Sequence, residues 1–111
     1  MGTILEDTKK ALGIMPNYDA FDDQLLMHIN TCRMDLVQLG AKCDVSIDRA
    51  TGWDAFAEID DEAAIKSYIA MKVRLIFDPP ANSFVVTSYQ KLIEEAAWRI
   101  VYHTDRKLPT P

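Results

Sequence analysis

Hydrophobic side chains recur at helical spacing along most of the chain, and glycines and prolines stand between the periodic stretches. A short helix is predicted over residues 3–12, because Thr3 and Glu6 form a capping box. A longer helix is predicted over residues 19–39 and is ended by Gly40. Its apolar stripe consists of Leu25, Ile29, Cys32 and Leu36.

The middle segment, residues 41–59, has weak periodicity and is predicted to be a loop with a short helical turn near residues 53–57. Trp53 and Phe56 in this segment are too large to lack contacts. Two interpretations stay open: the two rings cover one end of the core, or they dock on a partner, as interface aromatics often do.

A third helix is predicted from an acidic start at residues 60–62 to Phe77. Apolar side chains cover about two thirds of its circumference, so we expect it to be central or contacted from two sides. Lys72 falls inside the apolar arc, and we expect it to reach solvent or to meet a carboxylate of a neighbouring subunit. Residues 71–75 also alternate like a strand, but no breaker precedes them, which favours the helix.

A fourth helix, capped by Asn82 or Ser83, is predicted to run to about His103, after a proline pair that ends the third. Residues 104–111 contain two prolines and are predicted to be an extended C-terminal tail. The chain of 111 residues is therefore predicted to be all-α, a small bundle of about four helices over residues 1–103 with a loop-rich middle segment. No apolar run is long enough to span a membrane, so no membrane partner is expected.

Charge and missing motifs narrow the function. The net charge is −5 and the basic residues are scattered, so the footprint that grips nucleic-acid backbones is missing. Neither a phosphate loop nor a nucleophilic triad is recognisable, so we expect no enzymatic activity and no cofactor. The pair Asp22-Asp23 is interpreted as favourable charge at a helix start rather than as an acid–base pair.

The positions of the cysteines and histidines suggest a zinc site as one hypothesis. His28 and Cys32 are four residues apart on one helix face, and Cys43 and His103 would complete a zinc site. The spacing matches no standard finger, and Cys32 on an apolar stripe is typical of a small buried hydrophobe. No metal site is therefore expected.

Three segments carry a family resemblance. They are Phe21-Asp22-Asp23-x-Leu25-Leu26, then Tyr68-x-x-x-Lys72-Val73-Arg74-Leu75-Ile76-Phe77-Asp78-Pro79-Pro80 with Asn82-Ser83, and Ile93-Glu94-Glu95-x-x-Trp98-Arg99-Ile100. With these segments the chain resembles the small head–tail connector (adaptor) proteins of long-tailed bacteriophages and prophages, over most of its length.

The resemblance implies a structural protein without enzymatic activity, made in the bacterial cytoplasm and located in the virion. Such proteins assemble as homo-oligomeric rings, usually of about twelve subunits, beneath the portal protein. The ring extends the DNA channel without sequence-specific DNA binding, and it offers a platform to a stopper or tail-completion protein.

The resemblance and the residue types together suggest site residues. Candidates for the core or the subunit contact are Lys72, Arg74, Phe77, Trp98 and Arg99. Candidates for partner docking are Trp53, Phe56, Arg106, Lys107 and Leu108. A ring of subunits with net negative charge would repel DNA from its lumen wall, and candidate lumen acids are Asp44, Asp48 and Glu58.

An alternative hypothesis is a small acidic helical regulatory or inhibitory protein. It would bind a host protein as a monomer or dimer through the region of Trp53 and Phe56. Acidic character would suit competition with DNA for a basic groove.

Overall fold

The structure, a computed structural model, describes residues 2–56 and 62–107, except the side chains of 103–107. The described residues form four α-helices and a short 3-10 helix, which are α1 (Ile4–Leu12), α2 (Asp22–Gln38), η1 (Trp53–Ala55), α3 (Glu62–Phe77) and α4 (Ser83–Lys107). An isolated antiparallel bridge joins Thr3 to Gly52. The predicted all-α class is confirmed.

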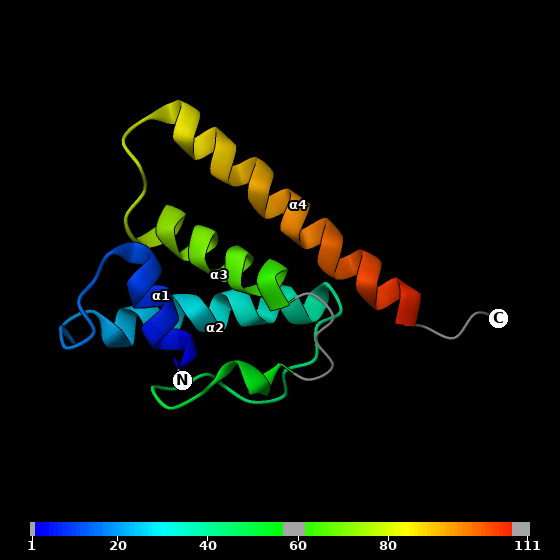
Figure 1. Cartoon of the computed structure of the whole chain (residues 1–111), viewed down its shortest axis with the longest axis horizontal. Helices are drawn as coiled ribbons and strands as arrows, with labels where there is room; N and C mark the ends of the chain where they lie inside the picture. The colour runs from blue at the N-terminus through cyan, green and yellow to red at the C-terminus, as the bar shows by residue number, and fades with distance from the viewer. Residues whose placement is uncertain (1, 57–61, 108–111) are drawn as a thin grey trace.

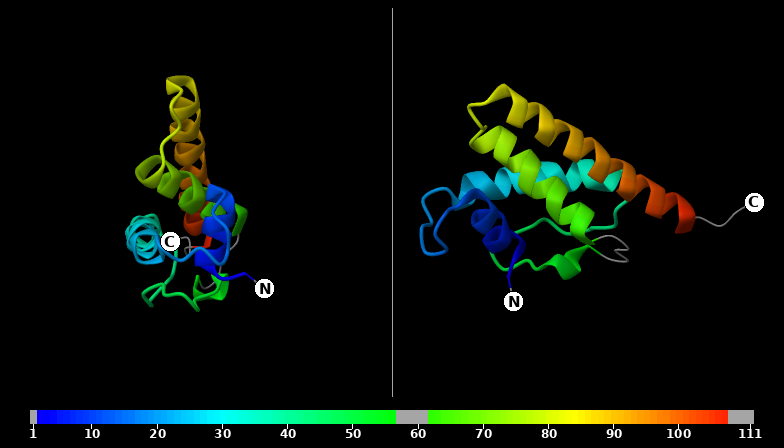
Figure 2. Two further views of the ribbon diagram at one scale, coloured as in Figure 1. Left: turned by 90° about the vertical axis from the view of Figure 1, so that its left-hand side faces the viewer. Right: turned by 45° about the horizontal axis from the view of Figure 1, so that its top comes forward.

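Helix α3 is the central element. It packs against α4 on one side and against α2 and α1 on the other, whereas α4 packs chiefly on α3. Figures 1 and 2 show this layering, with α3 between the long diagonal α4 and the α1–α2 pair. The expectation that the third helix is contacted from two sides is confirmed, and residues 71–75 are helical rather than extended.

The ends of α1 follow the signals in its sequence. The Thr3 hydroxyl accepts a hydrogen bond from the Glu6 backbone N–H at 3.1 Å. Gly13 adopts the left-handed conformation, with φ of 76°, after the last turn. The N–H of Ile4 donates to the carbonyl of Thr51 at 3.0 Å, so the first turn of α1 is tied to the middle segment.

Two helix boundaries differ from the prediction. Helix α2 begins at Asp22 rather than near Asp19, because residues 19–22 form a turn in which the Asp22 N–H donates to the Asp19 carbonyl at 3.1 Å. Helix α4 continues to Lys107 rather than ending near His103. No proline or glycine interrupts residues 104–107, and the predicted tail boundary therefore lies inside the helix. Residues 108–111 lie outside the described part of the chain.

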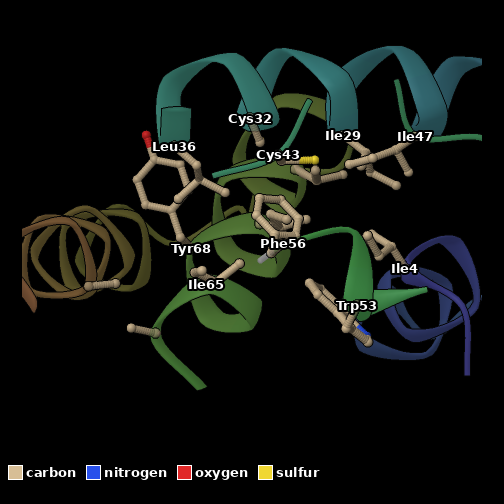
Figure 3. Packing of buried hydrophobic residues seen from close by; sticks show 14 of the residues in the cluster. Ile4, Ile29, Cys32, Leu36, Cys43, Ile47, Trp53, Phe56, Ile65 and Tyr68 are labelled. Atoms are coloured by element: carbon tan, nitrogen blue, oxygen red, sulfur yellow. The ribbon is translucent and has the colours of Figure 1, made fainter. Parts of the chain in front are cut away.

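The core draws on every element, including the middle segment. Ile29, Leu36 and Ile69 are fully buried on the helices, and the middle segment adds Cys43, Ile47, Trp53 and Phe56. Figure 3 shows Phe56 and Trp53 lying among side chains from α1, α2 and α3. Burial of each large apolar side chain contributes about 1.5–3 kcal/mol. The loop is thus a structural layer that closes one side of the bundle.

Candidate assembly surfaces

Lys72 lies on α3 and pairs with a carboxylate of its own chain. Its Nζ is 3.1 Å from Oδ2 of Asp35 on α2 and donates to the Tyr68 hydroxyl at 3.2 Å. Burial lowers the pKa of Lys72, but the hydrogen bonds to Tyr68 and Asp35 outweigh it and hold the pKa above its usual value. Lys72 is expected from the sequence to reach solvent or a neighbouring subunit; in the structure its charge is compensated between α2 and α3, and about a third of its side chain stays exposed.

Two further contact candidates lie on α3. Phe77 is half-buried, and its ring meets Phe21 edge-on with centroids 5.1 Å apart. Phe21 in turn packs on Tyr18 at 5.6 Å, so Phe77 anchors the connection between α1 and α2. Arg74 is half-buried one turn before Phe77. Both side chains are thus partly covered by their own subunit.

Trp98 and Arg99, by contrast, are exposed on α4. Trp98 leaves 64% of its surface accessible and stacks on Tyr102, with ring centroids 5.1 Å apart and planes 15° apart. The residues of α4 that pack inward are Ala96, Ile100 and the half-buried Ile93 and Ala97. At about 3.6 residues per turn, Trp98 and Tyr102 therefore stand on the side of α4 away from α3.

The burial of Trp53 and Phe56 contradicts the interpretation that they dock on a partner. They are only 9% and 2% exposed, and they belong to the core. The Trp53 Nε1 donates to Oδ2 of Asp7 on α1 at 2.6 Å, and Lys66 lies over the indole at 5.3 Å. The alternative interpretation, that these rings cover one end of the core, is the one observed. The regulatory hypothesis loses the docking surface on which it depended.

Two of the remaining docking candidates lie at the end of α4. Arg106 and Lys107 belong to its last turn, and their side chains are not among the described ones. Leu108 lies outside the described residues.

The cysteines of the metal hypothesis are buried in the core. Burial raises the pKa of Cys32 to about 12, so its thiol keeps its proton at neutral pH, whereas a metal ligand must lose it. Among the described residues, no three His, Cys, Asp or Glu side chains come together as a metal would require. The side chain of His103 is not among those described.

The candidate lumen acids have different surroundings. Asp44 is exposed on the middle segment. Asp48 is exposed too, and a hydrogen bond from the Thr51 hydroxyl, with another from the Ala50 N–H, lowers its pKa and keeps it ionised. Glu58 lies outside the described residues.

A second exposed apolar surface was missed by sequence reasoning. Met27 and Met34 of α2 are 60% and 59% exposed, opposite the buried stripe of the same helix. Their spacing of seven residues was a detectable signal, because it places them on one face.

Comparison of the sequence with known protein families identifies this protein as a component of viral assembly. A family model described as phage connector protein matches residues 4–107. The chain therefore belongs to the phage connector protein family, and its role is that of a head–tail connector that interacts with other head or tail proteins. No curated protein and no solved structure matches the chain significantly.

Membership in this structural family favours a virion location and a protein without enzymatic activity. Among the described residues, no helix combines the length and the apolar character needed to cross a bilayer.

Proposed function

We propose that this protein forms a homo-oligomeric ring of about twelve copies beneath the portal protein of a filled phage head. The ring extends the DNA channel and presents a platform for a stopper or tail-completion protein. The observation that carries the proposal is the family match, which spans residues 4–107 and so includes all four helices. In this role the chain acts through binding, without catalysis or a cofactor.

The surface of the subunit supports assembly. Large apolar side chains, among them Met27, Met34 and Trp98, are exposed on helices that already bury another face. Soluble monomers rarely expose extended apolar patches, and such patches commonly mark contacts between proteins.

Electrostatics support passage of DNA without sequence-specific binding. Each subunit carries a net charge of −5, so a ring accumulates negative charge around its axis. A negative lumen wall repels the DNA backbone and keeps the duplex from adhering. Asp44 and Asp48 are exposed and are proposed lumen residues.

The C-terminal end is the proposed contact with the portal. Arg106 and Lys107 end α4, and residues 108–111 follow with two prolines. Proline-rich segments have little conformational freedom to lose when they bind in extended form. Synthesis in the host cytoplasm followed by incorporation at the head–tail interface completes the proposal.

Native mass spectrometry tests the proposal directly. The purified chain is measured over a concentration series, alone and with the portal protein of the same phage. A discrete oligomer near twelve subunits, alone or with the portal, supports the connector ring. A monomer or symmetric dimer that ignores the portal contradicts it, and an added zinc mass would reopen the metal hypothesis.

A further inference from the structure

The outward side of α2 carries no charge along most of the helix. Its exposed residues after Asp23 are all uncharged, and we call them the α2 outer face: Gln24, Met27, Thr31, Met34, Val37 and Gln38. Two charged residues of the same stretch make contacts within the subunit instead. Arg33 donates to the carbonyl of Cys43 at 3.0 Å, and Asp35 pairs with Lys72. In a chain that is 26% charged, such a face is typical of an interface centre, where charged residues are depleted.

The outward side of α4 has a different character. Its large side chains, which we call the α4 outer face, are Phe84, Trp98 and Tyr102, with Lys91 and Glu95 between them. The stacked Trp98 and Tyr102 form a flat aromatic surface that is already ordered in the single subunit. Rigid aromatic side chains lose little conformational entropy on binding and often dominate interface energetics.

The two faces are separated by the body of the subunit. Helix α3 lies between α2 and α4, and both helices turn their buried stripes inward. Figures 1 and 2 show α2 and α4 on different sides of α3. One copy therefore cannot cover its own faces, and each face can receive a different neighbour.

We propose that the α2 outer face of one copy docks on the α4 outer face of the next copy. The inference rests on the proposed ring and specifies which surfaces meet in it. Methionine thioethers pack favourably against aromatic rings, so Met27 and Met34 suit the Trp98–Tyr102 surface. The lengths also correspond, because Gln24–Gln38 spans about 21 Å and Phe84–Tyr102 about 27 Å at a rise of about 1.5 Å per residue.

The contact between unlike faces explains growth beyond a dimer. Pairing of two identical faces is satisfied when two copies meet, whereas a head-to-tail contact leaves one face available at each end. Such a contact adds copies until the chain of subunits closes into a ring, or extends as an open filament where the rotation between copies does not close. Two unlike faces on one subunit thus favour head-to-tail growth over a symmetric dimer, and the proposed ring is the closed form of that growth.

Cysteine crosslinking between separately labelled subunits tests the pairing. Thr31→Cys lies in the middle of the α2 outer face and Glu95→Cys in the middle of the α4 outer face, while both native cysteines are buried. The first variant is prepared with 15N and the second without, so mass spectrometry distinguishes mixed from like pairs after mild oxidation. We expect the mixed 31–95 disulfide to exceed both like pairs at least fivefold.

Gln90→Cys is the matched control, because it is exposed on α4 but outside the α4 outer face. It should crosslink to Thr31→Cys at least fivefold less than Glu95→Cys does. Thermal melts of the reduced variants confirm that each one folds. The double variant Thr31→Cys/Glu95→Cys should give a ladder of covalent oligomers.

Other outcomes overturn the inference. Predominant 31–31 or 95–95 dimers would show pairing of like faces, and equal crosslinking at position 90 would show random collision. If the wild-type chain forms a ring in native mass spectra while the 31–95 disulfide stays rare, the faces are wrong and the ring stands. If 31–95 crosslinks dominate but no closed ring appears with the portal, the pairing stands and the ring fails.

Discussion

At the scale of single residues, the chain buries a lysine beside a carboxylate and a backbone carbonyl. The Lys9 side chain is only 4% exposed, and its Nζ lies 2.9 Å from Oδ1 of Asp22 and donates to the Pro16 carbonyl at 3.1 Å. Arg49 approaches the other Asp22 oxygen at 3.7 Å. Asp22 therefore joins α1, α2 and the middle segment, beyond the helix-start role that its position predicted. A buried charge without such partners would be strongly destabilising.

Removing one member of this pair should cost far more than removing an exposed charge. Lys9→Met should lower the free energy of unfolding by about 3–5 kcal/mol, because it leaves Asp22 buried beside one distant arginine. Urea denaturation followed by circular dichroism measures the change. Lys10→Met, on the exposed side of α1, is the matched control and should change stability by less than about 0.5 kcal/mol. A loss below about 1 kcal/mol for Lys9→Met would contradict the structural importance of the pair.

The raised pKa of Cys32 predicts that the fold loses stability at alkaline pH. The pKa of this residue is about 12 in the fold and 9.0 in an exposed thiol, so the unfolded chain ionises first as pH rises. The contribution is fully present below pH 9.0 and is lost as pH rises toward the folded pKa, with a slope of up to about 1.4 kcal/mol per pH unit.

Urea titrations of the wild type and of Cys32→Ala between pH 8 and pH 10.5 check this expectation. Tyr68 and Lys72, whose pKa values are also raised, titrate in both proteins, so the difference in slope reports Cys32. The variant should start less stable because of lost packing but should fall less steeply above pH 9. Parallel curves would contradict the buried, protonated thiol.

At the scale of elements, the middle segment is held to α2 by one amide side chain. The Asn30 Nδ2 donates to the carbonyl of Ile47 at 2.9 Å, and its Oδ1 accepts from the Ile47 N–H at 2.8 Å. The same Nδ2 also donates to the Leu26 carbonyl at 2.9 Å. Asn30 thus satisfies both backbone groups of Ile47, as a neighbouring strand would. This allows a chain segment without regular structure to be buried.

Asn30→Asp should loosen this attachment, because a carboxylate cannot donate to the Ile47 carbonyl. We expect a loss of about 1–3 kcal/mol and faster amide hydrogen exchange around Ile47. Thr31→Ala is a matched control on the exposed side of α2 and should leave that exchange unchanged. Equal exchange in both variants would show that apolar burial alone holds the segment.

The identity of the helices and the two ends of α1 were predictable from the sequence because their causes are local, whereas the start of α2 and the end of α4 were not. Thr3 and Gly13 cap α1 whatever packs around them, and the periodicity of α3 placed it correctly at the centre. Trp53 and Phe56 were not decidable, since burial and docking require the same residue types. The partner of Lys72 within the subunit was not predictable for a similar reason: Asp35 lies on another helix, and spacing along the sequence does not reveal which helices adjoin.

At the scale of the whole molecule, the subunit separates the residues that hold it together from those available for contacts. Charged groups inside it are paired across elements, as Lys72 with Asp35 and Lys9 with Asp22. Exposed apolar groups such as Met34 and Trp98 contribute little to the subunit itself. Fold and assembly should therefore respond to different substitutions.

Lys72→Glu and Trp98→Ser test this separation in opposite directions. Lys72→Glu places a second carboxylate beside Asp35, so the subunit should melt at lower temperature and assemble less in proportion to its lost stability. Trp98→Ser removes an exposed ring, so the free energy of unfolding should change by less than about 0.5 kcal/mol. Its assembly should need at least tenfold more protein, because the aromatic surface at the neighbour contact is lost. Thermal melts report the fold, and light scattering over a concentration series reports assembly. If Lys72→Glu abolished assembly at an unchanged melting temperature, Lys72 would bind a neighbouring subunit and the pairing with Asp35 would not explain its role.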